Sequence, residues 1–185
     1  MKGIIFNLLE GVVEKQFGEQ AWDDLLEKAG LEGVYTSVGN YPDAELVKLV
    51  AAAATTLDKS AEDVIRWFGV SAIPLLAEKY PGFFRPHDGT RSFLLTLNDI
   101  IHPEVRKLYP NADVPDFGYE IDPLRPEQLV MIYQSPRKLC VLAEGFIQGA
   151  AAHYGEDVTL RQTECMNNGA SRCVIQLSFH RRIVK

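Results

Sequence analysis

The sequence has little of what marks secreted, membrane and nucleic-acid-binding proteins. Its 185 residues include only three cysteines, an odd number that argues against a disulfide framework. No apolar stretch approaches the roughly 20 residues that a membrane-spanning helix needs. Acidic residues outnumber basic ones by 25 to 19, and the net charge of −6 argues against nucleic-acid binding, which begins with a basic field.

The amino-terminal segment does not have the composition of a signal peptide. Asn7 and Glu10 interrupt its apolar residues, and no small-residue cleavage site follows. The spacing of the apolar residues instead predicts an amphipathic helix. We therefore expect a cytoplasmic protein with one domain over residues 1–180 and a basic tail at residues 181–185.

Helical patterns come first along the chain, and strand patterns come later. Helices are predicted at residues 2–17, 19–28, 43–57, 60–79, 92–109 and 137–154. Strand composition is found at residues 129–133, 157–163 and 172–179. Pro74 is expected to kink or break its helix, and the prolines between 110 and 126 rule out a long regular element there. The order predicts an α+β fold, in which a helical subdomain packs on a C-terminal part with a small antiparallel sheet and a helix.

His102 is the histidine whose surroundings suit a metal ligand. It projects at the edge of an apolar stripe that includes Ile101 and Val105, so a neutral imidazole would emerge beside an apolar wall. Pro103 follows it and disfavours helical geometry at His102, which predicts a kink that aims the ring outward. On position alone, a partly buried histidine bonded to the backbone is the favoured alternative.

Three polar side chains alternate in the segment that follows the first predicted strand. In an extended chain Tyr133, Ser135 and Arg137 share one face, and Pro136 keeps the segment extended. Two hydroxyls and a guanidinium fork form a receptor for a carboxylate or a phosphate. The alternative is three unrelated polar residues at a strand end.

Taken together, these motifs resemble the haem nitric oxide/oxygen-binding (H-NOX) family, of the bacterial stand-alone type. Tyr-x-Ser-x-Arg after a helix with Ile-His is that family's signature, and residues 1–7 and 143–145 also look like it. The resemblance reaches to about Phe179. It implies haem b between the two parts of the fold, bound in a gas sensor that is not an enzyme.

The resemblance also implies roles for individual residues. His102 would be the proximal iron ligand, and Tyr133, Ser135 and Arg137 would bind the haem propionates. The haem pocket would include Ile5 and Leu9 on the distal side, Pro115 pressing on the porphyrin, and Leu142.

Family members that bind dioxygen place a tyrosine on the helix after the triplet. This sequence has none between Lys138 and Ala152, and Leu139, Leu142 and Phe146 predict an apolar pocket there. We therefore expect binding of nitric oxide and carbon monoxide and exclusion of dioxygen. Trp67, Glu144 and Gln148 are polar exceptions, and the sequence alone does not show whether they face this pocket.

The resemblance also implies how the signal leaves the sensor. In the family, nitric oxide weakens the iron–histidine bond, so release of His102 would shift the helical part against the sheet. The sequence has no kinase, cyclase or Walker motif. The signal would therefore pass in trans to a histidine kinase or a cyclic-di-GMP enzyme.

The cysteines leave a further set of alternatives open. Cys140, Cys165 and Cys173 could bind zinc with a fourth ligand, or they are simply buried thiols. Some bacterial family members complete such a site with a histidine, but Arg161, Gln162 and Thr163 occupy that neighbourhood here. His153 would serve only if the fold brought it close. Rival functions are a zinc or thiol redox sensor, a domain for a non-haem small molecule, and, least supported, an enzyme using Cys140 with a histidine.

Overall fold

The computed structural model describes residues 1–181 and has a mixed α+β architecture. Helices of the first part are α1 (Gly3–Phe17), α2 (Glu19–Ala29), α3 (Asp43–Leu57), α4 (Ala61–Lys79), α5 (Pro81–Phe84), α6 (Thr90–Leu94), the π-helical turn η1 (Leu97–Ile101) and α7 (His102–Leu108). The rest comprises β1 (Asp116–Glu120), β2 (Gln128–Gln134), α8 (Cys140–His153), β3 (Glu156–Glu164), the 3₁₀ helix η2 (Met166–Asn168) and β4 (Cys173–Arg181). Among the described helices, none is both long enough and apolar enough to cross a bilayer.

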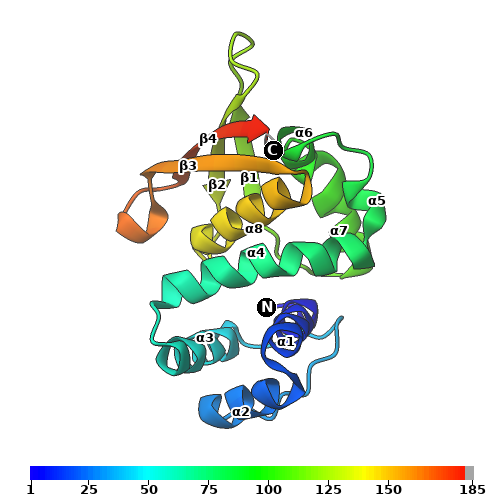
Figure 1. Ribbon diagram of the computed structural model, residues 1–185, viewed down its shortest axis with the longest axis vertical. Coiled ribbons are helices and arrows are strands. Elements are labelled where there is room, and N and C mark those ends of the chain that lie inside the picture. Colours follow the sequence, from blue (N-terminus) through cyan, green and yellow to red (C-terminus); the bar gives the residue numbers. More distant parts are fainter. Residues whose placement is uncertain (182–185) are drawn as a thin grey trace.

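Figure 1 shows two ends of the molecule with the long helix α4 between them. Helices α1, α2 and α3 gather at one end, and the sheet lies at the other with α8 on the side that faces α4. The strands described form one antiparallel sheet in the order β1-β2-β4-β3. Alternate residues of β2, namely Leu129, Met131 and Tyr133, are buried, as expected for a strand with one covered face. This arrangement buries Tyr133 close to the start of α8.

The buried apolar side chains form two cores. One lies between the sheet and α8 and includes Met131 and Ile175, which are at most 1% exposed. The other lies among α1, α2, α3 and α4 and includes the fully buried Phe6. Because α4 contributes Ile73 to the first core and Phe68 to the second, it forms a wall shared by both halves.

The helix predicted over residues 60–79 is present as α4, and it is not broken at Pro74. The proline-punctuated stretch holds the short strand β1, which pairs with β2. Arg181, predicted to open a tail, is the last residue of β4, and residues 182–185 of that tail lie outside the described residues.

The helix predicted over residues 92–109 is divided into α6, η1 and α7. The N–H of Ile101 donates to Thr96 and that of His102 to Leu97, both five residues back. His102 keeps helical angles, φ −64° and ψ −37°, so the expectation that Pro103 removes it from helical geometry is wrong. In an α-helix the ring of Pro103 would clash with the carbonyl four residues back, and a widened turn relieves that clash.

Candidate functional site

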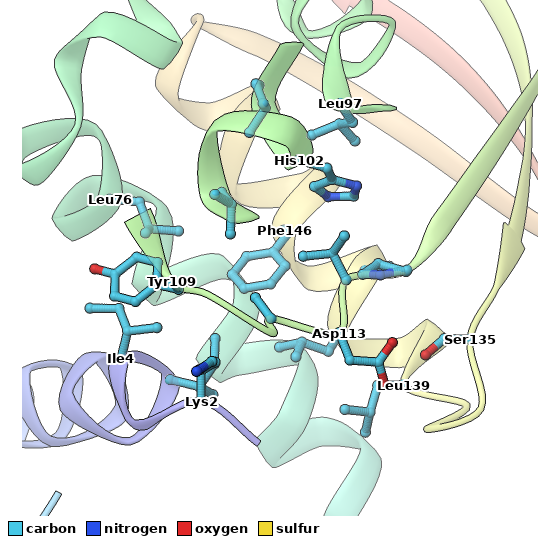
Figure 2. Close-up of a pocket in the computed structure, with 18 of the residues that line it drawn as sticks. Lys2, Ile4, Leu76, Leu97, His102, Tyr109, Asp113, Ser135, Leu139 and Phe146 are labelled. Atoms are coloured by element: carbon cyan, nitrogen blue, oxygen red, sulfur yellow. The ribbon is translucent and has the colours of Figure 1, made fainter. Parts of the chain in front are cut away.

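A cavity of ≈ 320 Å³ lies between the N-terminal helices and the sheet half. Its walls come from α1, α4, the segment from α6 to α7, the ends of β1 and β2, and α8. The lining is mainly apolar and includes Ile4, Leu76, Leu97, Leu139 and Phe146, which are labelled in Figure 2. Apolar walls with a few polar groups are typical of sites for small molecules and cofactors.

His102 begins α7 and forms part of the cavity wall (Figure 2). Its side chain is buried, and no hydrogen bond satisfies its Nδ1 atom. Burial lowers the pKa of His102 to about 4, with help from Arg106 and against weaker effects of Asp116 and the Pro115 backbone. The imidazole is therefore neutral near pH 7 and retains a lone pair for a metal.

The three residues of the Tyr–Ser–Arg triplet all line this cavity. Tyr133 is buried at the end of β2, and its hydroxyl oxygen accepts a hydrogen bond from the Leu139 backbone N–H at 3.0 Å. The Ser135 hydroxyl oxygen accepts one from the Arg137 backbone N–H at 3.3 Å. These backbone contacts fix both hydroxyl groups at the rim of the cavity.

Arg137 is held by carboxylates from two separate segments. Its Nε donates to Asp43, the first residue of α3, at 2.8 Å, and its Nη1 donates to Asp113 at 2.7 Å. Nη1 also donates to the Asp113 carbonyl oxygen at 2.9 Å. These bonds use Nε and Nη1 and leave Nη2 for a ligand, and they link the helical end of the fold to the cavity.

Three of the four apolar pocket residues predicted from sequence line the cavity, namely Ile5, Pro115 and Leu142. The structure does not bring Leu9 there. Leu9 is buried in the core shared by α1, α2, α3 and α4, and its neighbour Leu8 faces the cavity instead. Adjacent helical residues point about 100° apart, so a shift of one position exchanges the two faces.

Sequence reasoning missed two tyrosines of the cavity wall. Tyr80 and Tyr109 both line it, and their hydroxyl groups hydrogen-bond to each other. Each caps the C-terminal end of a helix, α4 and α7 respectively, and each is followed by proline. The repeated Tyr-Pro pair at helix ends was a signal that could have pointed to them.

The polar residues that sequence left unassigned do not line the cavity; they are Trp67, Glu144 and Gln148. Glu144 pairs with Arg66 at 3.0 Å and so ties α8 to α4. The Trp67 ring packs on Phe17, with ring centroids 5.8 Å apart. Leu139, Leu142 and Phe146 leave an apolar surface on the side of α8 that faces the cavity.

The three cysteines form a second cluster, at the start of α8 and the adjoining ends of β3 and β4. The Sγ atoms of Cys140, Cys165 and Cys173 all lie within 4.8 Å of one another. The backbone N–H of Met166 donates to the Cys173 sulfur at 3.2 Å. Burial raises the pKa of the Cys140 thiol to about 12 and also raises that of Cys173. Without a metal, both groups are therefore neutral thiols.

No histidine completes this cluster in the described part of the chain. His153 is at the far end of α8, where its ring packs on Phe84 and Tyr154. A 14-residue helix is about 20 Å long, so His153 is out of reach of Cys140.

The cavity residues fit the haem implied by the sequence. A buried, neutral histidine in the cavity wall supplies an imidazole lone pair for iron, and apolar walls cover a porphyrin face. Arg137, whose Nη2 is not used by Asp43 or Asp113, lines the cavity together with the Tyr133 and Ser135 hydroxyl groups, a donor set that suits propionates.

Comparisons with known proteins agree with this geometry. The sequence model of the Haem-NO-binding family matches residues 2–162. Among solved structures, the fold is similar to an H-NOX protein mutant from S. oneidensis in the Fe(II) state, with 34% identity, a TM-score of 0.90, and coverage of 99% of this chain and 98% of that one. An S. oneidensis H-NOX protein in the Fe(II)NO state gives 35% identity, a TM-score of 0.89, and coverage of 97% and 99%. The H-NOX domain from Shewanella oneidensis in the Fe(II)CO state has 34% identity and a TM-score of 0.88, and the match covers 98% of this chain and 100% of that one.

Proposed function

This chain belongs to the haem-NO-binding (H-NOX) family, and from that premise we propose that it is a sensor that binds nitric oxide and carbon monoxide at ferrous haem b. The observation that carries the proposal is the buried, neutral imidazole of His102 in the wall of an apolar cavity. Such an imidazole offers a nitrogen lone pair to a haem iron.

This proposal assigns a role in haem binding to residues from each part of the cavity wall. His102 is the iron ligand, Tyr133, Ser135 and Arg137 bind the propionates, and Ile5, Pro115 and Leu142 cover the porphyrin with apolar surface. When bound, haem supplies a ferrous iron that takes up a diatomic gas. The apolar walls exclude water from that iron.

Gas selectivity follows from the hydroxyl groups that the cavity offers. Bound dioxygen carries partial negative charge and is favoured by a hydrogen-bond donor, whereas nitric oxide binds ferrous haem without one. The α8 face of the cavity is apolar and offers no donor, and the bond between the Tyr80 and Tyr109 hydroxyls uses one of their two protons. We therefore propose that dioxygen is excluded. Similar structures in the Fe(II)NO and Fe(II)CO states support the choice of ligands.

We infer that the protein is a sensor without catalytic activity and that it signals to a separate partner in the cytoplasm, a histidine kinase or a cyclic-di-GMP enzyme. The sequence carries no motif of either enzyme, and its free cysteines fit a reducing compartment. Helix α4 packs against both halves of the fold. Release of His102 would therefore let the helical end shift against the sheet through α4.

The test is an absorption spectrum of the reduced protein with and without nitric oxide, for the wild type and His102→Ala. We expect a Soret band in the wild type that shifts on addition of nitric oxide, and loss of haem or of the five-coordinate spectrum in the variant. A colourless wild type made with ample haem would refute the proposal and favour a non-haem ligand. A stable oxy spectrum in air would refute the gas selectivity.

A second proposal concerns the cysteine cluster, which we propose binds zinc through Cys140, Cys165 and Cys173. Their sulfur atoms are close enough to share one ion, and an exogenous molecule would have to supply the fourth ligand. Metal analysis of haem-stripped protein should give one zinc per chain, and Cys165→Ser should abolish it. Absence of zinc in the wild type would leave buried thiols as the explanation.

A further inference from the structure

Asn98 joins the segment that carries His102 to the sheet. Its Nδ2 donates to the Phe117 carbonyl oxygen and, at 3.1 Å, to the Asp116 carboxylate. Its Oδ1 accepts a hydrogen bond from the Phe117 backbone N–H at 3.2 Å. One side chain of the π-helical turn thus binds both backbone groups of one strand residue.

These contacts occur on the free edge of the sheet. Strand β1 is an outer strand, paired only with β2, and Phe117 lies opposite Tyr133. In an antiparallel pair, every second residue turns its N–H and C=O away from the neighbouring strand. The outward N–H and C=O groups of Phe117 both bind the Asn98 side chain. The amide therefore makes the two hydrogen bonds that a neighbouring strand would make at this position.

The same strand residue contacts the iron ligand. The Phe117 ring lies 5.5 Å from the His102 ring and 5.7 Å from the Tyr133 ring, centroid to centroid. Phe117 lines the cavity, whereas Asn98, four residues before His102, does not. The Asn98 amide therefore lies outside the cavity lining. Its hydrogen bonds attach the segment that carries His102 to Phe117, the residue against which the imidazole packs.

On this geometry we propose that Asn98 is a positioning residue for the iron ligand: it holds the start of α7 against β1 and limits how closely His102 approaches the iron. The inference rests on the proposed haem function. A restrained imidazole makes a weaker bond to iron than one free to follow it, so Asn98 sets how readily His102 is released when nitric oxide binds.

The experiment compares three variants of the whole chain. Asn98→Leu keeps the branching at Cγ but makes neither backbone bond, and Asn98→Gln keeps the amide N–H and C=O groups. Ile100→Ala changes an exposed residue of the same turn, 54% accessible, and serves as the control. The readout is the iron–histidine stretching band of the reduced, gas-free protein by resonance Raman spectroscopy.

We expect a higher stretching frequency for Asn98→Leu, a return toward the wild-type value for Asn98→Gln, and no change for Ile100→Ala. The nitric oxide complex of Asn98→Leu should contain a larger six-coordinate fraction, because its histidine is retained longer. An Asn98→Leu band at or below the wild-type frequency overturns the proposal.

Amide hydrogen exchange separates this proposal from the haem function. The Phe117 amide should exchange faster in Asn98→Leu than in the wild type, whether or not the purified protein carries haem. Wild-type protein without a Soret band would defeat the proposed function. Haem bound normally, with equal exchange at Phe117 and an unchanged iron–histidine band, would defeat the role of Asn98 alone.

Discussion

Gly69 of α4 and Gly145 of α8 pack backbone against backbone. A Cβ atom on Gly145 would lie 2.3 Å from the Arg66 carbonyl oxygen, and one on Gly69 would lie 2.8 Å from the Leu142 carbonyl oxygen. Both distances are far inside van der Waals contact. Because α4 is the wall between the two halves, this pair of glycines sets how closely the halves approach each other.

The first prediction concerns that contact. Gly145→Ala should lower the free energy of unfolding by about 1–3 kcal/mol, because the added methyl group forces α8 away from the α4 backbone. Thermal or urea unfolding of the haem-free protein measures the change. Gly82→Ala is the matched control, since a Cβ there has no neighbour within 4 Å. Equal stability of the two variants would contradict the close approach.

Arg137→Ala should speed the loss of haem. A hydrogen bond to a charged group contributes about 1.5–3 kcal/mol, which corresponds to at least roughly tenfold weaker retention. Transfer of haem to an excess of apomyoglobin measures the rate. Arg125→Ala, at an exposed ion pair with Asp122, should leave the rate unchanged. Equal rates in both variants would remove Arg137 from the propionate site.

The haem-free protein should lose stability in acid partly through His102. Burial lowers the pKa of His102 from 6.5 to about 4, so between these values the unfolded chain binds a proton that the folded chain does not. The free energy of unfolding that depends on neutral His102 is fully present above pH 6.5. It is lost as the pH drops to about 4, by at most about 3 kcal/mol. His102→Leu should flatten the stability profile in that range, and His180→Leu, at an exposed site, should not. Parallel profiles for His102→Leu and the wild type would show that the imidazole is not buried.

The three thiols should differ in reactivity once any metal is removed by a chelator. Because burial raises the pKa of Cys140 and Cys173, both remain protonated at pH 8 and should react slowly with a disulfide reagent. The half-buried Cys165 should react first. We expect a single fast phase, lost in Cys165→Ser. Three equally fast thiols would mean that the cluster is open to solvent.

The sequence could predict those parts of the site that local geometry determines. Tyr133 and Ser135 face one cavity because alternation along an extended segment is a property of a few consecutive residues. Arg137 lines the same cavity from a turn at Pro136 and Arg137, so the expectation that the chain stays extended as far as Arg137 is wrong. The α+β order followed in the same way from the periodicity of apolar residues.

What the sequence could not predict depends on contacts between distant segments. Asp43 and Asp113 meet Arg137 from 94 and 24 residues away, and no local pattern marks either aspartate as its partner. Strand β1 was missed because its pairing with β2, rather than its own composition, makes it a strand. Leu9 was assigned to the cavity when the helix presents Leu8 there, since the pattern of apolar residues does not say which of two buried faces meets a ligand.

The π-helical turn before His102 carries one residue more than an α-helical turn would hold. The extra residue keeps the carbonyl four residues before Pro103 clear of the proline ring, which an ordinary α-helix would not do. A deletion within Leu97–Ile101 would restore that clash, so α7 would have to move from its place and the imidazole would no longer be held in the cavity wall. The number of residues in this stretch, together with the identity of Asn98 within it, therefore determines where the imidazole lies.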